Sequence, residues 1–436
     1  MSRGSLPVVL VVAAALRLAI PAFACVRAGS VTVLRTADSP QYLEAARSLW
    51  EDARYDGPLG PELMRPPGYP LFLIPGVALG HPELWAASAQ ALLGCLTVWL
   101  VYLAGRRLDP DPRAALTAAW LVALDPTHLA WSGRVMAEVP FTCLVAAALY
   151  GLVEHWRSGK RRWLMVATLA AGSSAYVRFV GYAMPAIVAI ALFLTATGRR
   201  RRAAGAAALV VGGGLLMAAP WHVRNGRVAD YWGFSSQPDR FLAFSTVAAL
   251  EAEARGDSMT ELRARARSRA LTPGNEDGRL YRALRASALD RVRDEPLAVA
   301  RTYLSGCLRT LLLPGALSLL EAFGPLPPGE KVASHAILDG DAAAALSVAP
   351  RRVQVTGALL ALAQVPIWLG VGLALRRGRP EIWMLVLVAL GLTLVSGGPW
   401  GSSRFRHPIV PFLALASGCG LAKLGRVSLD TRTAVQ

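Results

Sequence analysis

Apolar segments of about the length that crosses a lipid bilayer recur along this sequence, and they constrain its fold more than any other feature. Of its 436 residues, 54% are hydrophobic and only 17% are charged. A transmembrane helix needs roughly 20 mainly apolar residues. The candidate spans are 5–26, 83–104, 113–125, 136–154, 163–177, 179–197, 203–220, 352–375, 381–397 and 407–424. The sequence therefore predicts an all-α polytopic membrane protein with about 10–11 transmembrane helices in a single domain spanning residues 1–436.

The distribution of arginine predicts which loops share a side of the membrane. The formal net charge is +17, and much of it lies in the short loops 106–113, 157–162, 199–202 and 376–379. Such clusters are typical of cytoplasmic loops, so both termini are expected inside. The loops expected outside are 27–82, 126–135 and 221–351. Because this pattern accounts for the positive charge, nucleic acid is not an expected partner.

The large outer segment 221–351 contains two kinds of helix. Residues 251–295 are rich in Arg, Ala and Glu with helical spacing, which predicts solvated outer-face helices beside the membrane. Residues 297–321 are apolar enough to cross, but a full crossing would move the 376–379 arginines outside. A helix that lies at the interface or re-enters the membrane is therefore favoured over an eleventh crossing. This outer segment is the expected acceptor side.

Metal-binding motifs are weak in this sequence. The five cysteines lie in or beside apolar segments without a C-x-x-C pair, so neither a disulfide framework nor a zinc site is expected. His222 and His407 stand at the ends of candidate spans, where lone histidines are more often structural than metal ligands. No cofactor is predicted with certainty, and a divalent metal stays open as an alternative.

The first outer loop combines an acid and an arginine beside the membrane. Asp38 stands in a turn-prone Asp-Ser-Pro sequence, and residues 41–50, including Tyr42, have the spacing of an amphipathic helix on the membrane surface. Asp38 is interpreted either as the N-terminal cap of that helix or as a functional carboxylate. Arg65 precedes two prolines that stiffen the backbone. Its guanidinium suits a phosphate group, with contact to lipid headgroups as the alternative.

Further ionisable residues lie at the outer ends of the candidate spans. They are Arg134, Glu138, Arg178, Arg224, Arg404 and Arg406. Charged groups at membrane depth are costly and usually functional. Arg134 and Glu138 are spaced to pair across one helical turn. Together with the first loop, these residues predict a site for an anionic, phosphorylated lipid on the outer face.

Five motifs carry a resemblance to a known family. They are the Asp38 loop, Arg65-Pro66-Pro67-Gly68-Tyr69-Pro70, Arg134-Val135-Met136-Ala137-Glu138, Pro220-Trp221-His222-Val223-Arg224-Asn225 and Ser403-Arg404-Phe405-Arg406-His407-Pro408. In this order they resemble the GT-C membrane glycosyltransferases, specifically bacterial relatives of the protein O-mannosyltransferases and of the lipid A aminoarabinose transferase. The resemblance implies a GT-C-like fold and a multi-pass enzyme of the bacterial inner membrane. It also implies inverting transfer of a hexosyl or pentosyl group from a polyprenyl-phosphate carrier to a protein, glycolipid or polysaccharide acceptor on the extracytoplasmic side.

The resemblance also implies roles for individual residues. Asp38 occupies the position of the general base, and Arg65 that of the residue that binds the carrier phosphate. By the same match, Arg224 corresponds to the arginine after Pro-Trp, and Arg404 or Arg406 to the late arginine before a proline. Apart from the match, Tyr42, Tyr69, Glu138 and Arg178 are also expected to bind substrate. Glu138 is interpreted either as structural or as a contact to the acceptor or to a metal. The chain departs from the family at Ser39, where a second acid often stands, and at Ser402-Ser403, where an acid often precedes the late arginines.

The implied chemistry needs few groups. A glycosyl phosphate already carries a good leaving group, so a base for the acceptor hydroxyl and positive charge for the departing phosphate suffice. Two other classes of function stay open. One is a transporter or flippase of lipid-linked glycans, for which no internal repeat is evident; the other is a membrane acyltransferase or a structural polytopic protein.

Overall fold

The computed structural model of this protein describes residues 5–422, except for 58–59, 197, 199, 256, 273, 328–329 and 331–348. The last two residues of the expected span 407–424 and part of the expected outer loop 221–351 lie outside the described residues. The described chain is almost entirely helical, as predicted. Its one sheet is a short hairpin in which β1 (Asp56–Gly57) pairs antiparallel with β2 (Gly60–Pro61).

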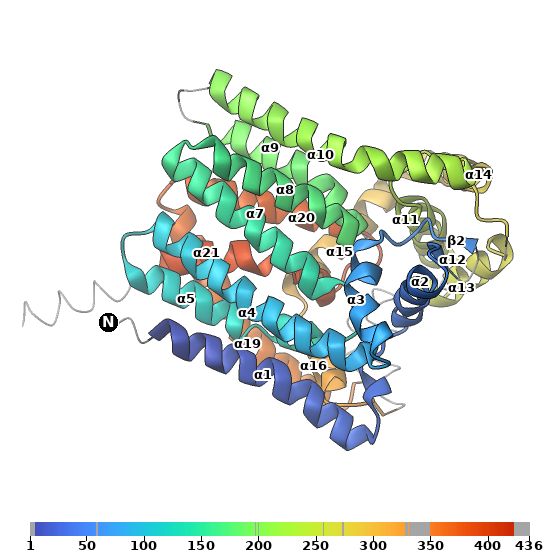
Figure 1. The fold of residues 1–436 in the computed structure, drawn as a ribbon, viewed down its shortest axis with the longest axis horizontal. Coiled ribbons are helices and arrows are strands. Elements are labelled where there is room, and N and C mark those ends of the chain that lie inside the picture. Colours follow the sequence, from blue (N-terminus) through green and yellow to red (C-terminus); the bar gives the residue numbers. More distant parts are fainter. Residues whose placement is uncertain are drawn as a thin grey trace, which may run out of the picture.

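Ten helices form the body of the molecule, and they cover most of every segment that was predicted to span. Five are long and apolar enough to cross a bilayer: α1 (Ser5–Ala28), α4 (Pro82–Leu108), α7 (Glu138–Ser158), α10 (Arg200–Ala229) and α19 (Arg351–Leu375). The shorter ones are α5 (Pro112–Ala123), α8 (Arg161–Val177), α9 (Met184–Leu194), α20 (Pro380–Ser396) and α21 (Val410–Leu421). Most of them lie side by side along the longest axis of the molecule (Figure 1).

Local sequence explains where these helices begin and end. Helix α4 begins at Pro82, with Glu83 in its first turn, and ends with Arg106 and Arg107. A proline at the first helical position and charges that oppose the helix dipole both favour these ends. Helix α7 stops at Gly159, which has a φ of +67°, a left-handed conformation that glycine adopts without a steric penalty.

Small residues allow close contact between the helices of the core. Helix α21 packs against α19 and α5. A Cβ atom built on Gly420 would lie 1.9 Å from the carbonyl oxygen of Gly370, and one on Gly418 would lie 2.3 Å from that of Ala114. Backbones approach this closely only where side chains are minimal, which is how helices commonly associate in membranes.

The loops that were predicted to be cytoplasmic meet at one end of the bundle. Arg107 pairs with Glu154 at 2.6 Å, and Arg379 pairs with Asp109 at 3.1 Å. The first ion pair joins the last turn of α4 to the C-terminal part of α7, and the second joins the loop after α4 to the residue before α20. The arginine-rich loops after α4, after α7 and before α20 therefore lie at one end, in agreement with the topology expected from charge.

Shorter elements gather at the opposite end (Figure 1). The helices α2 (Ser39–Glu51), α11 (Gln237–Phe241), α12 (Val247–Arg255), α13 (Met259–Ala270) and α14 (Gly278–Asp294) lie there with the hairpin. The other elements of the described residues are η1 (Val31–Leu34), α3 (Gly68–Ala78), α6 (Pro126–Ser132), η2 (Phe179–Ala183), η3 (Leu242–Thr246), α15 (Pro296–Leu312), α16 (Ala316–Ala322) and η4 (Ser403–Arg406). Segments from the first outer loop and from residues 237–294, far apart in sequence, thus lie together.

The apolar segment 297–321 is broken rather than one straight helix. Helices α15 and α16 are bent by 52°, with Gly315 at a φ of +80° between them. Arg406 holds the break, because its Nη1 donates to the carbonyl oxygens of Leu311 at 2.8 Å and Leu313 at 2.9 Å. This geometry is that of a broken span or a re-entrant loop.

Arg17, the charge inside the first span, is part of the packing. It is 1% exposed, and its guanidinium donates to the carbonyl oxygens of Ala123 at 3.1 Å and Val122 at 3.2 Å. These carbonyls belong to the C-terminal end of α5, where the helix dipole favours a cation. Arg17 therefore fastens α1 to α5, and it is not among the residues that line the cavity described below.

Candidate functional site

A large cavity of about 1580 Å³ lies at the end of the bundle that carries the short helices. Its wall combines charged side chains around Asp38 with apolar ones from α15, α16 and α19. Among the described residues, seven arginines and three carboxylates line it: Arg65, Arg178, Arg240, Arg263, Arg267, Arg285 and Arg404, with Asp38, Asp239 and Glu321. An apolar wall beside this excess of positive charge suits an amphiphilic ligand that has a hydrophobic part and an anionic group.

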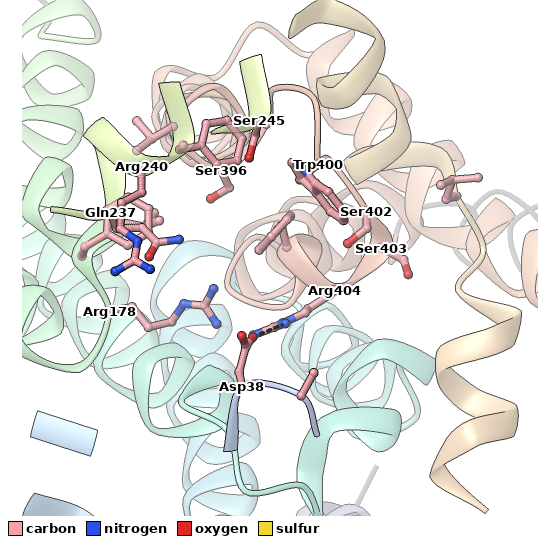
Figure 2. A pocket seen from close by; sticks show the side chains of 18 of the residues that line it. Asp38, Arg178, Gln237, Arg240, Ser245, Ser396, Trp400, Ser402, Ser403 and Arg404 are labelled. Carbon is pink, nitrogen blue, oxygen red and sulfur yellow. Dashed lines mark hydrogen bonds and ion pairs between the residues drawn. The ribbon is translucent and has the colours of Figure 1, made fainter. Parts of the chain in front are cut away.

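Asp38 lies at the base of this cavity, between two arginines. Its Oδ1 accepts from Nη2 of Arg65 at 3.0 Å. Its Oδ2 accepts from Nη1 of Arg404, also at 3.0 Å (Figure 2). Asp38 stands at the N-terminal cap position of α2, but its side chain makes no capping hydrogen bond. The interpretation of its carboxylate as a cap is therefore wrong, and 35% of the side chain is exposed.

The charge state of Asp38 follows from these contacts. Burial alone would raise the pKa of its carboxyl group, but the guanidinium groups of Arg65 and Arg404 outweigh that effect and hold the pKa well below its usual range. The carboxylate is therefore ionised throughout the physiological pH range.

Arg65 is held in place by its neighbours on α2. Its Nη1 donates to the hydroxyl of Tyr42 at 3.2 Å, and its Cζ lies 4.8 Å from the centre of the Tyr42 ring. Gln41 accepts two longer hydrogen bonds from the same guanidinium. Stacking and directional hydrogen bonds together fix a guanidinium more firmly than either alone, so Arg65 and Asp38 form a preorganised pair.

Glu138 links two further arginines behind this pair. Its carboxylate forms ion pairs with both Arg178 and Arg404, and the residue is only 1% exposed. Glu138 is not among the residues that line the cavity, whereas Arg178 and Arg404 both point into it (Figure 2). Glu138 is therefore placed to orient these arginines.

The spacing of Arg134 and Glu138 led to a wrong prediction. Arg134 instead pairs with Glu321 at 3.0 Å. Helix α7 begins only at Glu138, and the residues before it are not helical. The one-turn neighbour relation holds only inside a helix, so it does not apply here.

Three other predicted binding residues support the cavity from outside. Arg224 donates to the carbonyl oxygens of Glu62 at 2.7 Å and Tyr55 at 2.9 Å, and Arg406 holds the break between α15 and α16. Tyr69 is fully buried, and its hydroxyl donates to Gln90 at 3.0 Å. None of Arg224, Arg406 and Tyr69 lines the cavity, so each is placed to position other groups rather than to touch a ligand.

Glu62 was not predicted as a site residue, although its side chain fixes the backbone turn that carries Arg65. Its Oε1 accepts from the amide nitrogens of Met64 at 2.7 Å and Arg65 at 2.8 Å, and the residue is 4% exposed. Burial raises the pKa of this carboxyl group, and the two amides oppose that shift.

We expect Glu62→Ala to loosen the turn that carries Arg65, since it leaves two amides without their acceptor. Hydrogen–deuterium exchange at Met64 and Arg65 should then be at least about tenfold faster, as follows from losing roughly 1–3 kcal/mol per unsatisfied group. Glu62→Gln keeps an acceptor oxygen and should retain most of the protection. Equal exchange in the Ala variant and the unmodified protein would contradict this role.

Several arginines that line the cavity were not predicted from the sequence. Residues 251–295 were interpreted as solvated helices, and the structure confirms that they are helical. However, Arg263, Arg267 and Arg285 from α13 and α14 line the cavity, as does Arg240 from α11. Arginine at every second position from 263 to 269 was the available signal, because 263 and 267 share one helix face.

Histidine and acid side chains near the site do not form a cluster suited to a metal. Within the described residues, no group of three or more His, Cys, Asp or Glu side chains could hold an ion. Nδ1 of His407 lies 2.6 Å from the hydroxyl of Thr142, and its ring stacks on His128 with centroids 3.9 Å apart. His222 contacts the carbonyl oxygen of Trp232 and the hydroxyl of Tyr182. Both histidines therefore have structural partners.

Part of this chain is similar in sequence to known membrane glycosyltransferases. The family model of the dolichyl-phosphate-mannose-protein mannosyltransferases matches residues 64–223. The undecaprenyl phosphate-alpha-4-amino-4-deoxy-L-arabinose arabinosyl transferase of Pseudomonas aeruginosa is 28% identical over 174 residues, which are 38% of this chain and 31% of the relative. The enzyme of the same name from Pseudomonas paraeruginosa is 29% identical over the same share of each chain. The match thus spans about a third of the length of these curated relatives.

A solved structure extends the similarity to the whole fold. The archaeal oligosaccharyltransferase AglB from Archaeoglobus fulgidus, in complex with an inhibitory peptide and a dolichol-phosphate, aligns with a TM-score of 0.54 at 16% identity. The alignment covers 98% of this chain and 51% of that one. The chain therefore has the fold of this oligosaccharyltransferase, which is the GT-C-like fold that the order of its motifs predicted. Its apolar helices fit a multi-pass membrane protein.

Proposed function

We propose that this GT-C chain transfers a glycosyl group from a polyprenyl-phosphate carrier to a hydroxyl group of an acceptor, with inversion. The acceptor classes are those expected from sequence: a protein, a glycolipid or a polysaccharide. The observation that carries the proposal is the Asp38 carboxylate, ion-paired with Arg65 and Arg404 and partly exposed in a cavity with an apolar wall. We place the reaction at the extracytoplasmic face of the bacterial inner membrane, opposite the arginine-rich loops.

The phosphate of the donor would bind where the guanidinium groups converge. Arg65, Arg178 and Arg404 line the same part of the cavity as Asp38, and a guanidinium offers the donor geometry that phosphate oxygens accept. The apolar side chains of Leu317, Val353, Ala358 and Ala361 line another part. They would accommodate the first units of the prenyl chain, because burial of hydrocarbon there removes it from water.

The proposed reaction is a single displacement at the anomeric carbon. The acceptor oxygen forms a bond to that carbon while the bond from carbon to the phosphate oxygen breaks, and the phosphate leaves with the electron pair. The acceptor proton passes to Asp38. Negative charge grows on the departing phosphate, so Arg65 and Arg404 stabilise the transition state more than the bound donor.

Because Asp38 is ion-paired with Arg65 and Arg404, binding of the donor phosphate would also change the pKa of Asp38. A carboxylate held by two guanidinium groups is a weak base, because its pKa is low. A donor phosphate that draws Arg65 and Arg404 towards itself weakens these pairs and raises the pKa of Asp38. Binding of the donor would therefore strengthen the base that the reaction needs.

The role of Arg65 can be tested by lipid binding. We expect Arg65→Gln to raise the Kd for undecaprenyl phosphate about 10- to 100-fold, the effect of losing a hydrogen bond to a charged group of roughly 1.5–3 kcal/mol. Isothermal titration calorimetry on the full chain in nanodiscs measures this change. Arg47→Gln is the control, because Arg47 lies exposed on the same helix α2 and should leave the Kd unchanged. Equal affinities for all three proteins would contradict the proposed phosphate site.

Transfer itself distinguishes an enzyme from a flippase. Membranes that contain the protein, incubated with undecaprenyl-phosphate sugars labelled in the sugar, should move the label onto an acceptor. A flippase would instead change the side of the membrane on which the labelled lipid lies without changing its covalent structure.

A further inference from the structure

Positive charge in the cavity exceeds what the proposed donor phosphate needs. Around Asp38, three arginines face two carboxylates: Arg65, Arg178 and Arg404 with Asp38 and Glu138. The phosphodiester of a polyprenyl-phosphate sugar carries one negative charge, which balances this group. Any further unpaired arginine in the cavity therefore calls for a second anion.

Helix α13 supplies two such arginines. Arg263 and Arg267, one helical turn apart, both line the cavity, and neither forms an ion pair with any described residue. The other two arginines on this side are already paired, Arg240 with Glu276 and Arg285 with Asp239, each at 2.7 Å. The uncompensated charge is thus concentrated on one face of α13.

The surroundings of Arg263 resemble a binding site rather than a solvated surface. Its Cζ lies 4.2 Å from the centre of the Trp400 ring, and stacking of this kind fixes the orientation of a guanidinium. Nε1 of Trp400 is buried without a hydrogen-bond partner among the described residues, although a buried donor of this kind normally has one. The hydroxyl groups of Ser402 and Ser403 line the cavity beyond Trp400 (Figure 2).

These two arginines also repel each other and lie within electrostatic reach of the catalytic group. Burial lowers the pKa of Arg263, and the charge of Arg267 lowers it further, whereas Asp38 raises it. Arg263 is half-buried, whereas Arg267 is exposed. Two like charges one helical turn apart are unfavourable unless an anion neutralises them.

We propose that Arg263 and Arg267, together with Trp400, form a second anion-binding subsite, which holds a phosphate or carboxylate group of a substrate in addition to the phosphodiester of the carrier. This inference rests on the proposed function, because the charge balance assumes that the donor phosphate binds at Arg65 and Arg404. The second group belongs either to the acceptor or to a donor that is linked through a diphosphate. In either case, an anionic group would bind the guanidinium groups of Arg263 and Arg267.

The test uses the full chain in nanodiscs and three probes: undecaprenyl phosphate, undecaprenyl diphosphate and inorganic phosphate. The variant is R263Q/R267Q. The matched control is R265Q/R269Q, which removes the same charge from the same helix at positions that do not line the cavity. Calorimetry gives the Kd of each lipid, and then of inorganic phosphate added to protein already saturated with undecaprenyl phosphate.

Two results support the subsite and identify its source. If inorganic phosphate binds beside undecaprenyl phosphate, and R263Q/R267Q weakens it about tenfold or more while the control does not, the second group belongs to the acceptor. If undecaprenyl diphosphate binds the unmodified protein about tenfold more tightly than undecaprenyl phosphate, and only R263Q/R267Q removes this difference, the group belongs to the donor.

Other results overturn the subsite. Equal effects of the two variants would show a general effect of charge, and absence of both binding signals would leave α13 without a ligand. If undecaprenyl phosphate fails to bind the unmodified protein, the proposed function fails and the subsite fails with it. If that lipid binds while both second-anion signals are absent, only the subsite fails.

Discussion

Asp38→Asn is expected to lower the transfer rate about 10²- to 10⁴-fold, the usual contribution of a general base. Asparagine has nearly the same shape and can still accept a hydrogen bond, but it cannot take up the acceptor proton. The turnover number should fall at saturating donor, and the protein should still insert and fold. Transfer of label from undecaprenyl-phosphate sugars, measured in membranes with matched amounts of protein, gives the rate.

Binding of the donor separates this loss from a loss of affinity. Asp38→Asn also frees Arg65 and Arg404 from a carboxylate that competes with phosphate, so undecaprenyl phosphate should bind at least as tightly as before. Asp52→Asn is the control, because Asp52 is exposed beyond the other end of α2. An Asp38→Asn protein that retains full turnover would contradict the assignment of the base.

Glu138→Gln is expected to have the largest effect on stability. The carboxylate is almost fully buried and is the common partner of Arg178 and Arg404. Removing one member of a buried ion pair typically costs about 3–5 kcal/mol, since the remaining charge is left uncompensated. The thermal unfolding midpoint of the detergent-purified protein should fall clearly, and transfer should fall with it because both arginines lose their orientation.

An exposed ion pair of the same type provides the comparison. Glu261 pairs with Arg265 on the surface of α13, where both side chains are more than half exposed. Exposed pairs contribute little to stability, so Glu261→Gln should leave the midpoint almost unchanged. Similar midpoints for Glu138→Gln and Glu261→Gln would show that Glu138 does not organise the site.

The helical architecture could be predicted because it depends on local sequence. Each of the ten segments that were predicted to span is helical over most of its length, since a run of apolar residues can satisfy its backbone in lipid only as a helix or in a closed barrel. The short helices near the membrane were also predicted, from the spacing in residues 41–50 and 251–295. The charge of the loops predicted which of them meet.

The candidate site was predicted in part. Asp38 and Arg65 lie in one short loop with a stiff Pro-Pro sequence, and the structure brings them to 3.0 Å. Arg404 and Arg178 also lie in the cavity, as expected. Arg224, Arg406 and Tyr69 were expected to contact substrate, but they hold backbone or side chains outside the cavity. A motif indicates that a residue matters, and it does not indicate in which direction the side chain points.

By itself, the sequence determined the membrane helices, their ends and the gathering of the polar loops, because hydrophobicity and helix-end preferences act over a few residues. Only the tertiary structure decided which charges meet. Arg404 reaches Asp38 across 366 residues, and Arg134 pairs with Glu321 rather than with its near neighbour Glu138. Which charged side chains form ion pairs depends on how the ends of distant helices pack. The same packing places Arg263 and Arg267 of α13 in the wall of the cavity. No local pattern encodes that arrangement.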